Sequence, residues 1–336
     1  MAKTNKEKIE IELDNKEKAL AQAPVIVSAS RSTDIPAFYC DWFFHRLKVG
    51  YSAWTNPFNK KDMYVSYAKT RFIVFWSKNP RPLLEHIDEL KARGIGCYIQ
   101  YSLNDYEEEK LERGVPPLAE RIETFKKLVD VLGKGSVIWR FDPLVLTEDI
   151  TIEKLLNKIE NIGDQLKGYT EKLVFSFVDI LSYNKVKNNL KANGISFVDW
   201  TEEQMAEFAS RLVALNKEKG WNYKLATCGE RGRYPGVEPN HCIDDELIIK
   251  KSFHDKELMN YLKAEIKPMP PRDMFTNTIT LPEGAIILDS NHYVTRGDNR
   301  DKGQREFCGC MKSKDIGQYN TCIHMCEYCY ANTSKE

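Results

Sequence analysis

VIWRFDP, at residues 137–143, is a short apolar run that ends in charged residues. Helical patterns lie on both sides of it, at 118–132 and 152–166, and each of them adjoins another apolar run. Buried strands that alternate with helices predict a parallel sheet with right-handed crossover connections. The stretch therefore predicts an α/β fold, in which residues 137–141 form one of the strands.

The same alternation continues toward both ends of the chain. Seven runs have the composition of buried strands, at 24–29, 51–54, 72–76, 97–101, 137–141, 173–177 and 223–227. Helical patterns fall between them at 38–49, 82–93, 118–132, 152–166 and 202–219. With 336 residues the chain is long enough for one large core. We expect a complete or partial (β/α) TIM-like barrel, followed by a cysteine-rich C-terminal extension.

Three regions of the chain differ in character. Residues 1–22 are a mixed-charge lead with few apolar positions, where we expect a solvated arm or an edge element. Residues 23–230 hold the predicted barrel. Residues 231–336 contain a Gly/Pro-rich loop, a predicted short helix at 244–251 and a stretch rich in Pro, Asp and Asn at 267–299. Cysteines lie on both sides of that stretch, so we expect this extension to pack on the barrel and to bring cysteine ligands to its rim.

Charge and cysteine content argue against several classes of protein. Lys+Arg and Asp+Glu both number 49, so no global charge attracts the chain to nucleic acid or to an anionic membrane. No apolar run approaches the ~20 residues of a membrane span, and the N-terminus lacks the apolar core of a signal peptide. Five of the nine cysteines fall between Cys308 and Cys329, which is more typical of metal or catalytic thiols than of disulfides. We expect a cytoplasmic protein without a membrane partner, and we do not expect nucleic acid as a partner.

Polar residues follow every predicted strand. In a barrel these ends form one rim, where active sites are assembled. A polar residue at any one strand end can simply begin a loop. Polar residues at all seven consecutive strand ends together favour an active site. Arg140 and Asp142 are the strongest candidates, because unpaired charge beside the run Val-Ile-Trp would be costly. The other candidates at strand ends are Ser30, Arg31, Asp34, Asn56, Lys78, Gln100, Ser102, Ser176, Asp179, Cys228 and Glu230.

Three cysteines lie within eight residues near the end of the chain, at Cys322, Cys326 and Cys329. Thiolates at such close spacings commonly bind an iron–sulfur cluster. A cubane of four irons needs four ligands, so three cysteines would leave one iron open to a ligand that is not protein. A zinc site is the main alternative, because zinc also binds thiolates and His324 lies inside the loop. A disulfide framework is the weaker alternative for so long a chain.

Two resemblances rest on these motifs. The spacing of the three cysteines, with Tyr328 before the last of them, is similar to that of radical S-adenosylmethionine (SAM) enzymes. From about residue 24 to 332 the chain also resembles the family called domain of unknown function 1848, which is regarded as radical-SAM-like and has no settled reaction. The motifs that carry the second resemblance are SASRSTDIP (28–36), NPFN (56–59), FWSKNP (75–80), WRFDP (139–143), SFVD (176–179), CGC (308–310), KDIGQYNTC (314–322) and YCYAN (328–332).

The resemblance to radical SAM enzymes implies a [4Fe-4S] cluster whose open iron binds SAM. An electron from the cluster would break a C–S bond of SAM and give a 5′-deoxyadenosyl radical. It also implies a low-potential electron donor such as flavodoxin or ferredoxin, and a small-molecule or peptide substrate. In those enzymes the cysteine loop usually follows the first strand and a Gly-Gly-Glu segment contacts SAM, whereas here the cysteines come last and no such segment follows the second strand.

Roles for individual residues follow from the same resemblance. Tyr328 would pack near the adenine of SAM. The other residues expected to bind the cofactor are Ser30, Arg31, Asp34, Gln100 and Ser176. The residues expected to position SAM or substrate, and therefore the catalytic candidates, are Arg140, Asp142, Lys78 and Glu230.

Four further cysteines lie in loops, at Cys228, Cys242, Cys308 and Cys310. Four thiolates would complete a second [4Fe-4S] cluster or a structural zinc site, and both interpretations stay open. Gly309 would let the backbone bend around a metal. The remaining two cysteines, Cys40 and Cys97, have the surroundings of core residues.

These observations lead to three hypotheses of different classes. The leading one is an enzyme that cleaves SAM reductively in the mouth of the barrel. The first alternative is an iron–sulfur protein that carries electrons without SAM chemistry. The second is a zinc-stabilised protein that processes nucleic acid, against which the balanced charge argues.

Overall fold

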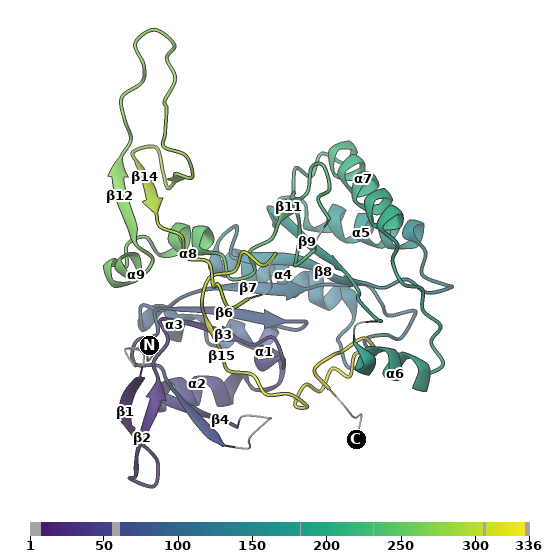
Figure 1. Cartoon of the computed structure of the whole chain (residues 1–336), viewed down its shortest axis with the longest axis horizontal. Coiled ribbons are helices and arrows are strands. Elements are labelled where there is room, and N and C mark those ends of the chain that lie inside the picture. Colours follow the sequence, from purple (N-terminus) through teal and green to yellow (C-terminus); the bar gives the residue numbers. More distant parts are fainter. Residues whose placement is uncertain (1–7, 56–60, 182, 231, 305–306, 333–336) are drawn as a thin grey trace.

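A parallel sheet of eight strands runs through the centre of the molecule (Figure 1). The computed structural model describes residues 8–55, 61–181, 183–230, 232–304 and 307–332. The order across the sheet is β11-β10-β9-β8-β7-β6-β3-β15, and neighbouring strands are parallel throughout. These strands are β3 (Ile26–Ala29), β6 (Phe72–Ser77), β7 (Gly96–Ser102), β8 (Val137–Leu144), β9 (Lys172–Phe177), β10 (Lys224–Thr227), β11 (Glu238–Pro239) and β15 (Lys314–Asp315).

The α/β architecture expected from the sequence is confirmed in this sheet. Six of the seven predicted strands belong to it, namely those predicted at 24–29, 72–76, 97–101, 137–141, 173–177 and 223–227. The outer strands β11 and β15 have two residues each, which is too short for a sequence pattern to reveal. In the described ranges no pairing joins β11 to β15, so closure into a barrel stays a prediction.

Alternate residues of the central strands face two different layers. Ile73 and Phe75 of β6 belong to the larger apolar core, which helices cover. Phe72 and Val74 belong to a second core, formed with the C-terminal extension. This period of two is the side-chain alternation of a strand, and both faces of a parallel sheet are normally covered. The helices on the larger core are α1 (Ile35–Phe38), α2 (Cys40–Val49), α3 (Ile87–Ala92), α4 (Leu118–Leu132), α5 (Ile152–Leu166), α6 (Asn184–Ala192) and α7 (Glu202–Glu218), with the 3₁₀ turn η1 at Arg81–Glu85.

One predicted strand lies in a different sheet. Residues 51–54 do form a strand, β4 (Tyr51–Thr55), but β4 pairs antiparallel with β5 (Asp62–Ser66). The connection between them is too short for the crossover that a parallel neighbour requires. The sheet is completed by β2 (Lys18–Gln22) and β1 (Lys8–Glu12), so described residues of the charged lead form a hairpin. The predicted strand end at 56–57 lies outside the described residues.

The C-terminal extension covers the second face of the parallel sheet and then returns to its edge. Helices α8 (Asp245–Ser252) and α9 (Lys256–Tyr261) pack on that face. A three-stranded sheet of β12 (Ala264–Pro268), β14 (His292–Arg296) and β13 (Ile286–Ile287) follows, and a long loop projects from it (Figure 1). The chain then comes back to β15, which pairs with β3. None of the described helices has both the length and the apolar character needed to cross a membrane.

Asp255 connects α9 to the start of β6. Its carboxylate accepts hydrogen bonds from the Nε (2.7 Å) and Nη2 (2.9 Å) atoms of Arg71, and it also caps α9 through the backbone N–H of Leu258 (3.0 Å). We expect Asp255→Ala to lower the free energy of unfolding at pH 7 by about 1–2 kcal/mol, because a cap and an ion pair are lost together. Asp255→Asn keeps a capping oxygen and should cost less. Equal stability of wild type and Asp255→Ala in urea denaturation would contradict this.

The same pair predicts a pH dependence. Burial would raise the pKa of Asp255, but hydrogen bonds from Arg71 outweigh it and hold the pKa below its ordinary value of 3.8. A carboxyl group with a lowered pKa stabilises the folded protein at pH values above the ordinary pKa. This stabilisation is lost as the pH falls through the lowered pKa. The stability difference between wild type and Asp255→Asn should therefore shrink below about pH 4.

Candidate functional site

Predicted polar residues gather at the carboxyl edge of the parallel sheet, and Gln100 and Arg140 among them contact Cys242 on the face that the extension covers. Trp76 and Gln100 are paired positions on β6 and β7, and Arg140 follows on β8. The side-chain alternation that places Phe72 and Val74 on this face also places Trp76 there. The sequence-predicted residues that belong to this edge are Ser30, Lys78, Gln100, Arg140, Asp142, Ser176 and Cys228.

Arg140 and Asp142, the two strongest candidates from the sequence, lie side by side. The Arg140 guanidinium forms an ion pair with the Asp142 carboxylate and donates a hydrogen bond to Gln100 Oε1 (3.1 Å). Ser176 Oγ donates to the other oxygen of Asp142. Arg140 is fully buried, and a buried charge of this kind is stable only when it is paired. The structure thus brings four predicted residues into one hydrogen-bonded group.

Four cysteines lie beside Arg140. Cys228 and Cys242 place their Sγ atoms 3.1 Å apart, and Arg140 Nη1 is 3.4 Å from Cys242 Sγ. The backbone N–H of Cys242 donates to Cys310 Sγ (3.1 Å), and Cys308 forms a hydrogen bond with Cys310. We call these four residues the inner cysteine set. Hydrogen bonds from Cys228 and Cys310, and then the charges of two arginines, hold the pKa of Cys242 well below its ordinary value despite burial. A thiolate is the form that binds metal.

Gly309 of the inner set lies in close contact with His241. Its backbone does not adopt the left-handed conformation that favours glycine. A Cβ atom at this position would lie 2.2 Å from His241 Nε2, so the absence of a side chain makes room for the imidazole. Gly309 therefore permits the close approach of His241 to the 308–310 loop, and its expected role in bending the backbone around a metal stays a prediction.

Cys322, Cys326 and Cys329 also reach this edge, and we call them the outer cysteine set. Cys322 accepts hydrogen bonds from the backbone N–H groups of His324 and Asp34. Cys326 is buried, which raises the pKa of its thiol.

Asp315 brings the outer set to the edge of the sheet. Its carboxylate accepts hydrogen bonds from Ser28 Oγ (2.9 Å), Ser30 Oγ (2.9 Å) and the backbone N–H of Arg31 (3.0 Å). A Cβ on Gly317 would come within 1.6 Å of Ser30 Oγ, so the two segments are in close contact. Ser30, which was expected to bind a cofactor, therefore uses its hydroxyl to fix the returning chain.

A buried hydrogen-bond network surrounds Tyr328, next to Cys326. Lys78 Nζ donates to Glu112 Oε1 (2.7 Å) and to the Tyr328 hydroxyl (2.8 Å). Tyr328 also bonds to Glu112, and Asn104 Nδ2 donates to Glu112 Oε1 (2.9 Å). Burial would raise the pKa of Glu112, but the positive charges of Lys78 and Arg121 lower it to about 2. Lys78 and Tyr328 were predicted from the sequence, whereas Glu112 and Asn104 were not.

Asp34 and His324 form a second buried contact beside the outer set. His324 Nε2 lies 2.7 Å from Asp34 Oδ2, and its Nδ1 lies 3.0 Å from the carbonyl oxygen of Gly114. Asp34 also accepts from the backbone N–H of Lys78 (2.7 Å). His324, which lies in the loop between Cys322 and Cys326, is buried and fixes that loop.

The two cysteine sets belong to one continuous site. Asn104 bonds to Tyr328 on one side (3.1 Å) and to the backbone of Asp142 on the other, through Asp142 N–H (2.8 Å). The Asp142 carboxylate in turn forms an ion pair with Arg140, whose guanidinium contacts Cys242 of the inner set. The outer and inner sets are therefore joined through a chain of side-chain contacts along the sheet edge.

One known protein family matches nearly the whole of the chain that forms these sheets, helices and loops. The family model described as Domain of unknown function (DUF1848) matches residues 26–331. The chain belongs to the DUF1848 family. No curated protein and no solved structure matches it.

A cavity of about 390 Å³ opens beside the inner set of the DUF1848 domain. Its wall includes Cys308, Glu230 and the arginines Arg233, Arg296 and Arg300. Glu230, a predicted catalytic residue, also accepts a hydrogen bond from the backbone N–H of Phe177 (3.2 Å). Glu230, in the loop after β10, thus contacts the end of β9 and lines this cavity.

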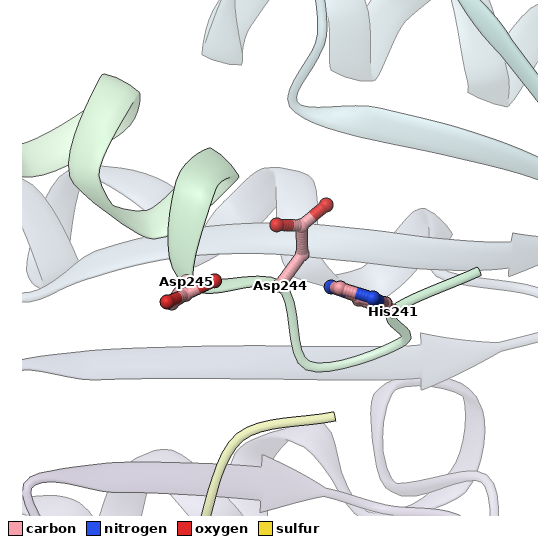
Figure 2. Close-up of side chains that lie close together, drawn as sticks. All are labelled: His241, Asp244 and Asp245. Atoms are coloured by element: carbon pink, nitrogen blue, oxygen red, sulfur yellow. The ribbon is translucent and has the colours of Figure 1, made fainter. Parts of the chain in front are cut away.

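One further group of potential ligands is explained by local structure. His241, Asp244 and Asp245 each place one ligand atom within 4.8 Å of the others (Figure 2). The two carboxylates point in different directions in Figure 2. Asp244 caps α8 through the N–H groups of 246 and 247, and Asp245 pairs with Arg296 (2.7 Å). We assign this group to helix capping and an ion pair.

Proposed function

We propose that this DUF1848 protein is a radical SAM-type enzyme whose outer cysteine set binds a [4Fe-4S] cluster. The observation that carries the proposal is the placement of Cys322, Cys326 and Cys329 at the carboxyl edge of a parallel sheet. Three thiolates fit a four-iron cluster and leave one iron for SAM. When bound, this cluster would supply the electron that cleaves SAM to a 5′-deoxyadenosyl radical.

The surrounding residues support the proposal through positioning. Lys78, Glu112 and Tyr328 fix the backbone around Cys326, and Asp34 with His324 fixes the loop that precedes it. Arg140 and Asp142 lie between the two cysteine sets and are placed to orient a polar cofactor or substrate. Burial of this edge would keep water away from a reactive intermediate.

Several expected side chains already have partners inside the protein. Ser30 bonds to Asp315, Ser176 to Asp142, and Gln100 to Arg140 and to the carbonyl of Cys242. We propose that these residues act mainly by holding the site, and that Tyr328 lies closest to the cofactor. A low-potential electron donor, a small-molecule or peptide substrate and a cytoplasmic location complete the proposal.

A spectroscopic experiment tests the proposal. The chain would be reconstituted anaerobically with iron and sulfide, and we expect about eight irons per chain if both sets bind a four-iron cluster. After reduction, SAM should change the electron paramagnetic resonance spectrum of wild type and of Cys228→Ala. The change should be absent in Cys326→Ala. If the protein contains its full complement of iron but SAM does not change its spectrum, the alternative of an electron carrier is favoured. Zinc in place of iron would favour a structural metal site.

A further inference from the structure

Three N–H-bearing side chains surround the inner cysteine set. The guanidinium of Arg31 lies 5.3 Å from the centre of the Trp76 ring, and that of Arg140 lies 5.2 Å from it. Arg140 contacts Cys242 directly (3.4 Å). Arg31 is close enough for its charge to act on Cys242, Cys308 and Cys310. The Trp76 indole and the guanidinium groups of Arg31 and Arg140 therefore form one group beside the four thiols of the inner set.

Two donors of this group are buried without an acceptor. Arg31 Nε and Trp76 Nε1 are shielded from solvent and have no hydrogen-bond partner among the described residues. A buried donor that is left unpaired costs about 1–3 kcal/mol, and most such groups in folded proteins find a partner. Two unpaired donors next to the same four thiols indicate a shared acceptor.

None of the described residues supplies this acceptor. The four cysteine sulfurs are present in the structure, and neither Arg31 Nε nor Trp76 Nε1 bonds to them. A zinc ion is a cation and accepts no hydrogen bond, so a Cys₄ zinc site would add no acceptor beyond the four thiolates, to which neither donor bonds. An iron–sulfur cluster adds inorganic sulfides, which are anionic acceptors that extend beyond the thiolates.

We infer that Cys228, Cys242, Cys308 and Cys310 bind an iron–sulfur cluster, and that Arg31 and Trp76 donate hydrogen bonds to its sulfides. Arg140 contributes a third N–H group toward the Cys242 sulfur. The inference deepens the proposed function by choosing between a cluster and zinc at the second centre. Positive charge and hydrogen bonds toward the sulfurs stabilise the more negative, reduced state and raise the reduction potential.

The test uses the full-length Cys326→Ala chain, so that the inner set can be studied without the SAM-binding centre. After anaerobic reconstitution with iron, sulfide and zinc all present, we expect iron and inorganic sulfide in equal amounts. Adding Trp76→Phe removes the indole donor but keeps an aromatic ring between the two arginines. We expect its iron content to stay the same and its reduction potential, followed by electron paramagnetic resonance, to become more negative.

Controls keep the outcome interpretable. Trp42→Phe changes an exposed tryptophan on α2 and should leave the potential unchanged. If Trp76→Phe does not load iron, Arg31→Lys removes the Nε donor while keeping the charge, and it should also lower the potential. Zinc without iron in the parent, or an unchanged potential in both variants, would overturn the inference. Failure of SAM to bind in wild type with an intact inner cluster would refute only the proposed function.

Discussion

Cys326→Ala is expected to lose about four irons per chain and all SAM-dependent chemistry. Cys326 is the most deeply buried thiol of the outer set, and it lies beside the Lys78–Glu112–Tyr328 network. Removing one of three thiolates leaves a cluster with too few protein ligands, whereas the inner set keeps all four. Iron, sulfide and zinc determination after anaerobic reconstitution measures the loss directly.

A matched control is available in the same chain. Cys97 is a thiol within β7 that belongs to neither cysteine set. Cys97→Ala should keep the full iron content and the response to SAM. Equal iron content in Cys326→Ala and wild type would show that the outer set does not hold the cluster.

Glu112→Gln is expected to lower the free energy of unfolding by about 3–5 kcal/mol. The Glu112 side chain is only 3 % exposed, and its carboxylate accepts hydrogen bonds from Lys78, Asn104 and Tyr328. Removing its charge leaves the ammonium of Lys78 without its counter-ion in a buried site, and breaking a buried pair in this way is costly. Urea denaturation of the metal-free protein at pH 7 measures the effect.

Glu108→Gln provides the matched control, four residues earlier in the same acidic run. Glu108 is 75 % exposed and pairs with Lys154 at 3.3 Å. An exposed pair contributes little, so we expect a change of at most about 1 kcal/mol. Similar losses for Glu112→Gln and Glu108→Gln would contradict the role given to the buried network.

The parallel sheet could be predicted from sequence because its strands are buried on both faces and alternate with helices. β4 shows the limit of that argument. Its composition is that of a strand, but its partner is decided by the short connection to β5, which produces an antiparallel pair. The two-residue strands β11 and β15 depend on tertiary contacts, so no local pattern marks them.

The site was predictable where polar residues end apolar strands, as for Arg140, Asp142 and Lys78. Glu112 was hidden because it lies in a charged run, EEEKLER at 107–113, that resembles a solvated surface. Asp315 was hidden for another reason: its role depends on residues nearly three hundred positions earlier in the chain. The signal that could have drawn attention to it was its place within the motif KDIGQYNTC at 314–322.

The central claim is that the outer cysteine set supports reductive cleavage of SAM. Its most direct test is to incubate the reconstituted full-length protein anaerobically with SAM and a low-potential reductant, and to quantify 5′-deoxyadenosine. We predict that wild type and Cys97→Ala form this product and that Cys326→Ala does not. If wild type carries its full complement of iron and still forms no 5′-deoxyadenosine, the claim is wrong.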